Sequence, residues 1–381
     1  MSAWKLVPVA VLCYLFSTVS QAHKPSDSYL TLTQGDHGTS LEGQWDIALR
    51  DLQHALNLDL DGDGAITWGE LQQRRLALTR YALARLRIEA VARGDRANCR
   101  LQSQDMLFDR HVDGGYAVLR FTAQCPLRPA QLAVHYWLFF DLDPNHRGLL
   151  DVRAGGYDQA SVLAAASPDL TLNLGAPERL AQFRAFLDEG IWHIWKGYDH
   201  ILFLLTLLLP AVVLFHNGRW EPRNSLRDAL LDVLKVVTAF TVAHSLTLSL
   251  AVNGLVQLPS RVVESGIALT VLLGAVNNVL PVVRARRWVA AFVFGLIHGM
   301  GFASVLMDLG LSGWNLALAL VGFNLGVEVG QLAIVLVFIP FAFGLRRTRF
   351  YRLAFMPGGA VAIGVIAAYW LAIRITGISV Q

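Results

Sequence analysis

The feature that most constrains the fold of this chain is a series of long apolar stretches in its second half. A helix needs about 20 apolar residues to cross a bilayer. Only 16% of this chain is charged, against about 25% in ordinary soluble proteins. We therefore expect residues 190–375 to form an α-helical membrane bundle of about six transmembrane helices. The spans are expected at about 190–214, 230–253, 262–282, 288–308, 314–342 and 355–375.

The first 22 residues have the pattern of a secretory signal peptide. Lys5 gives the positive start, Leu6 to Phe16 the apolar core, and Ser20-Gln21-Ala22 the small-residue cleavage site. An uncleaved anchor is the alternative, but the apolar core is much shorter than a membrane span. Cleavage would expose His23, whose amine and imidazole are able to chelate copper or nickel, and an ordinary frayed terminus is the alternative there.

Residues 23–175 are more polar and are expected to fold outside the cytoplasm as an α+β domain. Alternating apolar residues predict strands at 29–33, 41–49, 116–122 and 131–140, which favours a β-sandwich-like architecture. Export permits disulfides, and Cys99 and Cys125 allow one pairing, with two free buried thiols as the alternative. Residues 176–189 are expected to be an amphipathic linker at the membrane surface.

Residues 59–70 have the pattern of an EF-hand calcium loop. Gly64 stands at the obligatory turn, and hard carboxylate oxygens suit Ca²⁺. Because the loop is single and lies in an exported domain, we expect weak structural binding in the ~10⁻⁴–10⁻³ M range. An acidic turn without metal is the alternative. The expected ligands are Asp59, Asp61, Asp63, the carbonyl of Ala65, Thr67 and Glu70.

Basic residues follow alternate spans, in the loops after the first, third and fifth. The positive-inside rule places these loops in the cytoplasm of a bacterial-type inner (plasma) membrane, with the N-terminal domain and the C-terminus extracytoplasmic. The net charge of +3 has its source in these loops and gives no case for nucleic-acid binding. The arginines are Arg219, Arg223 and Arg227; Arg284, Arg286 and Arg287; and Arg346, Arg347, Arg349 and Arg352.

Polar and ionisable side chains recur inside the expected spans. Charged groups in hydrocarbon cost about 2–4 kcal/mol each, so they persist where they meet partners, water or an ion. Gly322, Gly326 and Gly330 form a row beside them that is expected to admit a neighbouring helix. The candidate metal ligands are His193, Asp199, His200, His244, Glu264, His298, Asn324 and Glu328.

The rise of 1.5 Å per residue assigns these candidates to two depths. His193 and Glu264 are expected at the outer mouth, and the others in a mid-membrane layer. Imidazoles and carboxylates in steps are what Ni²⁺, Co²⁺, Zn²⁺ or Cu²⁺ would need to lose water gradually. The alternative is that each polar group merely pairs one span with another.

Three stretches carry a more specific signal: Gly190-Ile-Trp-His-Ile-Trp-Lys-Gly-Tyr-Asp-His-Ile-Leu-Phe203, Ala243-His-Ser-Leu-Thr247, and Phe294-Gly-Leu-Ile-His-Gly-Met-Gly-Phe-Ala303. Together with Glu264, they resemble the HupE/UreJ family of membrane proteins, in its longer branch with an exported N-terminal domain. The resemblance covers the whole membrane half. That family is associated with nickel supply to hydrogenase and urease, so the resemblance implies metal permeation, with metalloenzyme-maturation proteins as partners.

The leading hypothesis is transport or delivery of a divalent transition metal, without catalysis. The first alternative is a membrane-embedded zinc-type hydrolase, in which three histidines hold the metal and Glu328 or Asp199 acts as base. The second is a membrane-anchored receptor or assembly factor whose exported domain binds a ligand.

Overall fold

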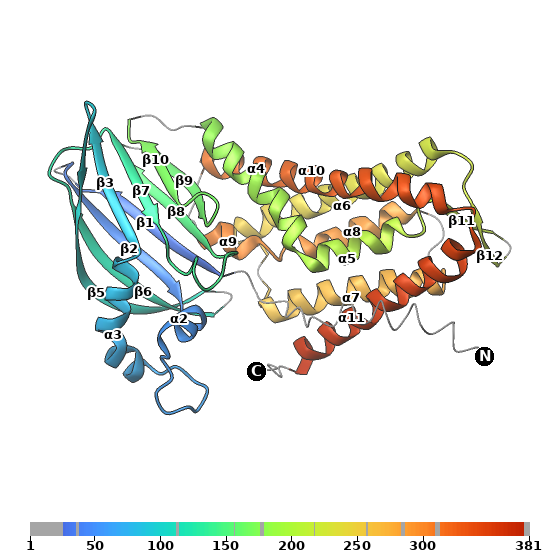
Figure 1. Ribbon diagram of the computed structural model, residues 1–381, viewed down its shortest axis with the longest axis horizontal. Coiled ribbons are helices and arrows are strands. Elements are labelled where there is room, and N and C mark those ends of the chain that lie inside the picture. Colours follow the sequence, from blue (N-terminus) through green and yellow to red (C-terminus); the bar gives the residue numbers. More distant parts are fainter. Residues whose placement is uncertain are drawn as a thin grey trace. The chain divides into compact units, whose positions relative to one another are not determined.

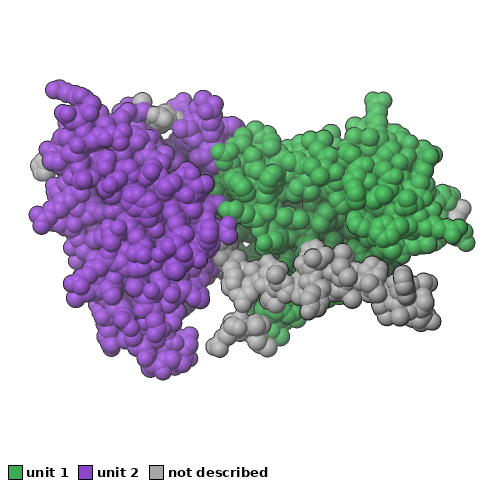
Figure 2. Space-filling model, in the orientation of Figure 1, with its two compact units in different colours: residues 1–22, 187–303, 323–381 green, residues 23–186, 304–322 purple. Residues whose placement is uncertain are grey.

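The computed structural model describes residues 26–376, except 36–37, 112–113, 156, 176–178, 217, 257, 283–285 and 309–312. The expected signal peptide, His23 and Arg284 lie outside the described residues. The chain divides into two compact units, coloured separately in Figure 2. The β-rich unit contains residues 23–186 and 304–322, and the helical unit contains residues 1–22, 187–303 and 323–381.

The β-rich unit consists of two sheets that share one apolar core (Figure 1). Leu30 and Leu119 of the first sheet and Ile88 and Val134 of the second belong to the same buried cluster. The first sheet has the order β5-β6-β2-β1-β8-β9 and the second β10-β7-β3-β4. The strands are β1 (Asp27–Gln34), β2 (Ser40–Ala48), β3 (Leu86–Ala92), β4 (Asp95–Asn98), β5 (Arg100–His111), β6 (Gly114–Gln124), β7 (Gln131–Tyr136), β8 (Arg147–Ala154), β9 (Tyr157–Ala164) and β10 (Asp169–Asn173).

The four strands predicted from alternating apolar residues correspond to β1, β2, β6 and β7. In β2 the alternation puts Leu41 and Trp45 in the core, which is why this sequence forms a two-faced strand. The expectation of a β-rich N-terminal region is confirmed. Cys99 and Cys125 form the predicted disulfide, which joins the ends of β4 and β6.

The helical unit is rich in long apolar helices. Four helices among the described residues are long and apolar enough to cross a membrane: α6 (Leu226–Val252), α7 (Ser260–Val279), α10 (Gly313–Leu345), and the π-helical segment Tyr351–Phe355 continued by α11 (Met356–Thr376). The membrane character is therefore confirmed, while the first and fourth expected spans contain shorter helices. These are α4 (Arg179–Lys196), α5 (Tyr198–Leu208), α8 (Arg287–His298) and α9 (Ala303–Asp308).

The first expected span, 190–214, is not one helix, because the chain breaks at Gly197. Gly197 has ψ 91°, outside the helical region, and separates α4 from α5. A Cβ at this position would lie 2.7 Å from the carbonyl oxygen of His193 and 2.9 Å from Nδ1 of His200, so the turn requires glycine. Helix α5 then ends at Leu208, just before Pro210. Residues 179–189 of the expected linker and the start of the span instead share the continuous helix α4.

The predicted glycine row on α10 does admit a neighbouring helix, and that helix is α4. A Cβ on Gly326 would clash with the backbone of Leu187, and a Cβ on Gly190 would clash with the carbonyl oxygen of Phe323. Close backbone approach of this kind is how membrane helices associate without large side chains. The contact fixes the end of α4 that carries His193.

Three of the arginine-rich loops meet at one end of the helical unit. Nη2 of Arg223 donates to Oδ2 of Asp232 at 2.8 Å, and Nη1 of Arg287 donates to the same oxygen at 3.4 Å. Nε of Arg346 donates to the carbonyl oxygen of Arg223 at 2.7 Å. The hairpin of β11 (Val213–His216) and β12 (Arg219–Pro222) lies beside these loops in sequence. The loops that the positive-inside rule assigns to one side are thus joined at one end of the bundle.

Candidate metal centre

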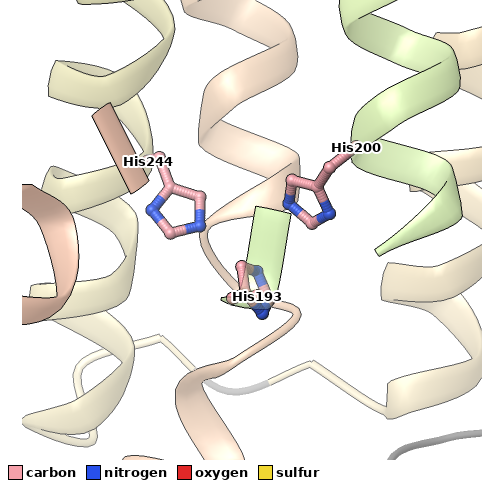
Figure 3. A group of neighbouring side chains, drawn as sticks. All are labelled: His193, His200 and His244. Atoms are coloured by element: carbon pink, nitrogen blue, oxygen red, sulfur yellow. The ribbon is translucent and has the colours of Figure 1, made fainter. Parts of the chain in front are cut away.

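Three histidines from three helices form a compact cluster in the helical unit. His193 lies on α4, His200 on α5 and His244 on α6, and a nitrogen of each lies within 4.8 Å of the others. Figure 3 shows the three rings around a common space. Two nitrogens that share one ion at ~2.1 Å each can be at most ~4.2 Å apart, so small ring rotations suffice to bring all three onto one ion.

The break at Gly197 brings His193 and His200 together. On a continuous helix, seven residues would separate them by about 10 Å along the axis. Their ring centroids instead lie 4.6 Å apart. The expectation that His193 belongs to a separate outer layer is therefore wrong, because it assumed an unbroken span.

Asp199 forms a hydrogen bond with the ring of His200. Its Oδ1 lies 3.0 Å from Nδ1 of His200 and 2.9 Å from the backbone nitrogen of the same residue. A carboxylate only accepts hydrogen bonds, so Nδ1 carries the proton and Nε2 keeps its lone pair. That Nε2 is buried and has no hydrogen-bond partner in the described structure.

Asn324 has the same role for His244. Its side-chain oxygen lies 3.2 Å from Nδ1 of His244, across the contact between α10 and α6. An amide oxygen accepts, so Nδ1 of His244 donates and Nε2 remains a free acceptor. Nε2 of His244 is likewise buried without a partner among the described residues.

His298, at the C-terminal end of α8, is oriented by Thr270 of α7. The Thr270 hydroxyl donates to the carbonyl oxygen of Ile267 at 2.6 Å, so its oxygen accepts from Nε2 of His298 at 2.9 Å. Here the free nitrogen is Nδ1, which is buried and unpartnered in the described structure. His298 lies outside the three-histidine group, with its ring centroid 5.1 Å from that of His200.

Aromatic rings surround the histidines and form an apolar wall. Phe302 and Phe323 stack on each other and lie within 5.2 Å of His193, between ring centroids. Phe203 and Phe240 flank His298 at 4.9 and 5.3 Å. Unpaired lone pairs in such surroundings are costly. A bound cation with affinity for imidazole would remove that cost, and neutral nitrogen ligands select Ni²⁺, Co²⁺, Cu²⁺ or Zn²⁺ over Mg²⁺ and Ca²⁺.

The remaining predicted ligands lie outside the three-histidine group. Glu264 on α7 accepts a hydrogen bond from Nε of Arg374 at 3.3 Å. Glu328 on α10 accepts one from Thr238 at 3.1 Å. Asp199 and Asn324 each hydrogen-bond to a histidine of the group through Nδ1. Sequence reasoning missed Thr270. The available signal was a hydroxyl within an otherwise apolar expected span.

The acidic loop between α2 (Leu49–Leu56) and α3 (Trp68–Leu83) is a second group of potential ligands. Carboxylate oxygens of Asp59, Asp61 and Asp63 lie within 4.8 Å of one another. Glu70 accepts hydrogen bonds from the backbone nitrogens of Leu60 at 2.7 Å and Thr67 at 2.8 Å. Bonds from Thr67 and Leu60 to the charged form lower the pKa of Glu70 to about 2, which keeps this carboxylate ionised.

Comparison with known proteins gives one family match. A family model described as HupE / UreJ protein matches residues 171–374, more than half of the chain. The match contains all four histidines described above. No curated protein matches the chain.

Proposed function

The chain belongs to the HupE/UreJ family, which is linked to metal uptake, and from this premise we propose that it transports or delivers a divalent transition metal such as nickel or cobalt. The observation that carries the proposal is the set of buried imidazole nitrogens without partners on four helices. In three of the four histidines a hydrogen-bond partner holds the other nitrogen, so the free one is a Lewis base. His193, His200 and His244 are the proposed ligands.

Metal uptake by cells that produce the chain tests this proposal. We expect uptake of Ni²⁺ or Co²⁺ above that of cells without it. His200→Ala should abolish the gain, because this ring contacts both His193 and His298. The exposed variant Asp95→Asn, on β4 of the β-rich unit, is the matched control for expression. Unchanged uptake of Ni²⁺, Co²⁺, Zn²⁺ and Cu²⁺ in the His200 variant would contradict the proposal.

A zinc-type hydrolase is the second candidate, favoured by the three histidines on one site. Such an enzyme leaves one metal position open for water and needs a base beside it. Asp199 is engaged by His200, and Glu328 by Thr238, which argues against a free base in the described structure. The amount of metal that survives dialysis of the purified chain separates the two functions. One tightly held ion per chain favours the enzyme, and a labile ion favours transport.

We propose further that loop 59–70 binds Ca²⁺ weakly. Asp59, Asp61 and Asp63 already lie together, but Glu70 would have to exchange its hydrogen bonds from Leu60 and Thr67 for the ion. This competition is consistent with affinity in the ~10⁻⁴–10⁻³ M class. Calcium titration of the purified chain, followed by calorimetry, tests the proposal, and Asp63→Asn should remove the signal.

We also propose that the arginine-rich end faces the cytoplasm of the inner membrane, with the β-rich unit and the C-terminus outside. The joined loops of Arg223, Arg287 and Arg346 support one common side. In this arrangement metalloenzyme-maturation proteins would receive the ion in the cytoplasm. Labelling of cysteines introduced at Arg347 and Thr376 with a membrane-impermeant reagent tests the orientation. Reaction at position 347 but not at 376 in intact cells would reverse it.

A further inference from the structure

The nitrogens that the three-histidine group offers to an ion are enclosed. His200 and His244 are buried, and His193 is partly buried. The Nε2 atom of each of these rings is buried and has no hydrogen-bond partner in the described structure. An ion that binds these nitrogens must therefore displace part of the surrounding wall on its way in.

On the side of the arginine-rich loops, the wall consists of phenylalanines on three helices. Phe203 lies one turn beyond His200 on α5, which continues toward these loops. Phe240 lies one turn before His244 on α6, which begins beside them. The ring centroid of Phe203 is 5.2 Å from that of Phe240 and 5.8 Å from that of Phe294 on α8. All three rings belong to or pack against the apolar core of the helical unit, so an opening on this side would disturb that core.

On the opposite side, the wall is one pair of stacked rings. Phe302 and Phe323 are nearly parallel, with an angle of 5° between their planes and 4.2 Å between their centroids. Both contact the ring of His193, at 4.9 and 5.2 Å between centroids. Phe302 comes after α8 and Phe323 lies in the first third of α10, and both helices have their other ends at the arginine-rich loops. The core cluster of the described helical unit includes neither ring, so this pair is the weaker side of the wall.

Phe302 is placed so that it is able to move without displacing a helix. It lies in the short turn between α8 and α9, and its side chain is buried. The residue before it, Gly301, is exposed and has the wide backbone freedom of glycine. One aromatic ring therefore separates an exposed stretch of backbone from the imidazole of His193.

We propose that Phe302 is the gate residue of the metal centre, and that its ring leaves Phe323 to admit an ion to His193 and then returns. This inference rests on the proposed transport function and names the residue that controls entry. His193 is then the first ligand to bind, because it contacts both rings and is the least buried of the three histidines. A stacked ring pair is a modest interaction, so the gate opens at little cost. Entry is from the end of the bundle opposite the arginine-rich loops.

The test follows the binding and release of Co²⁺ alone by the full chain in detergent, by stopped-flow absorption. A gate sets the barrier that the ion crosses in both directions, and it leaves the affinity of the closed site nearly unchanged. Phe302→Ala should therefore raise the association and dissociation rate constants together, by about tenfold or more, and change the dissociation constant by less than about threefold. Phe302→Tyr, which keeps an aromatic ring on Phe323, should have the rate constants of wild type.

Three results would overturn the inference, and they differ from failure of the proposed function itself. If Phe302→Ala leaves both rate constants as in wild type, its ring is not the gate. If Phe203→Ala raises both rate constants and Phe302→Ala does not, the ion enters from the side of the arginine-rich loops. If Phe302→Ala raises the dissociation rate constant alone, the ring stabilises the bound ion and does not control entry. Wild type that binds no Co²⁺ at all would instead contradict the proposed function.

Phe323→Ala provides an independent variant in case Phe302→Ala does not fold. It removes the other ring of the pair from α10, so we expect the same parallel rise of both rate constants. Phe338→Ala is the matched control, because Phe338 packs against the core on the same helix about 22 Å farther along its axis. That control should keep the rate constants of wild type. An equal rise in Phe338→Ala would show that any loss of packing in the helical unit speeds exchange, and that result would also count against the inference.

Discussion

Three histidines of the candidate metal centre are each oriented by a neighbour of different chemistry. A carboxylate holds His200, an amide holds His244 and a hydroxyl holds His298. The sequence revealed the histidines because charged and polar groups are rare in apolar spans. It did not reveal which polar residues are ligands and which only orient them, because this difference depends on contacts between helices. That Asp199 and Asn324 hydrogen-bond to the Nδ1 atoms of His200 and His244 is visible only in the structure.

We predict that Asp199→Asn weakens metal binding by about 10–100-fold without removing it. The amide oxygen is still able to accept from Nδ1 of His200, but the negative charge that favours a nearby cation is lost. Competition titration of Ni²⁺ against a chromophoric chelator measures the change. An equal loss in Glu264→Gln, whose carboxylate pairs with Arg374, would show that any intramembrane charge has this effect.

In the β-rich unit, the buried histidine His146 sets a pH limit on stability. At the two ends of a buried chain of hydrogen bonds that contains His146, Nε1 of Trp45 donates to Ser28 and the Ser26 hydroxyl donates to Asp51. Burial lowers the pKa of His146 to about 3. The chain of bonds passes from Trp45 through Ser28, Tyr136, His146 and Ser26 to Asp51, with donor–acceptor distances of 3.1, 2.7, 2.6, 2.6 and 2.9 Å.

We predict that acid destabilises the β-rich unit through His146. Below its ordinary pKa of 6.5 the unfolded chain binds a proton that the folded chain rejects, so stability is full above 6.5 and is lost as the pH falls toward 3. Between pH 7 and 5 the loss is about 2 kcal/mol. Burial raises the pKa of Asp151 to about 6 and acts in the opposite direction over this range. Chemical denaturation at both pH values in wild type and His146→Gln isolates the histidine, because the variant keeps only the opposite trend.

Two of the helices that carry histidines of the candidate metal centre begin or end beside one, whereas His244 lies within the continuous helix α6. His200 lies in the first turn of α5 after the break at Gly197, and His298 is the last residue of α8. Broken helices at mid-membrane are tolerated where they line a protein site, and they are common in transporters. Hydropathy predicted the four long apolar helices but joined α4 to α5 and α8 to α9, where the structure has shorter helices. The apolar pattern on either side of Gly197 continues unchanged, so only the backbone geometry shows the break.

We predict that the close contact of α4 with α10 depends on Gly326. Gly326→Ala should destabilise the helical unit by about 1–3 kcal/mol, because the added Cβ meets the backbone of Leu187. Gly344→Ala is the matched control on the same helix, since nothing lies within 4 Å of its Cβ. That variant should be neutral or slightly stabilising, because alanine favours a helix by about 1 kcal/mol over glycine. Thermal unfolding in detergent compares the two, and equal melting temperatures would rule out the contact as a source of stability.

At the scale of the whole molecule, the chain has two cores and two kinds of metal ligand. One core lies between the sheets of the β-rich unit, and the other lies among α5, α6, α7, α10 and α11. Hard carboxylates occur in loop 59–70 of the first unit, and imidazoles occur in the second. The sequence indicated this division from the change in composition. It did not indicate that residues 304–322, from within the apolar half, group with the β-rich unit, because that depends on contacts distant in sequence.

The separate cores predict that each unit responds to its own ion. At 10 mM Ca²⁺, about tenfold above a ~10⁻³ M dissociation constant, binding to loop 59–70 should add about 1.4 kcal/mol to the β-rich unit. This should raise the melting temperature of one calorimetric transition of the full chain by about 3–6 °C. Co²⁺ should raise the other transition, because its ligands lie in the helical unit.

A control ion and two variants show which unit gives rise to each calorimetric transition. Mg²⁺ at the same concentration controls for ionic strength, since it binds such loops poorly compared with Ca²⁺. Asp63→Asn should remove the Ca²⁺ shift and keep the Co²⁺ shift, and His200→Gln should do the reverse. If Ca²⁺ moves both transitions together, or if the chain unfolds in one step, the two units do not respond independently.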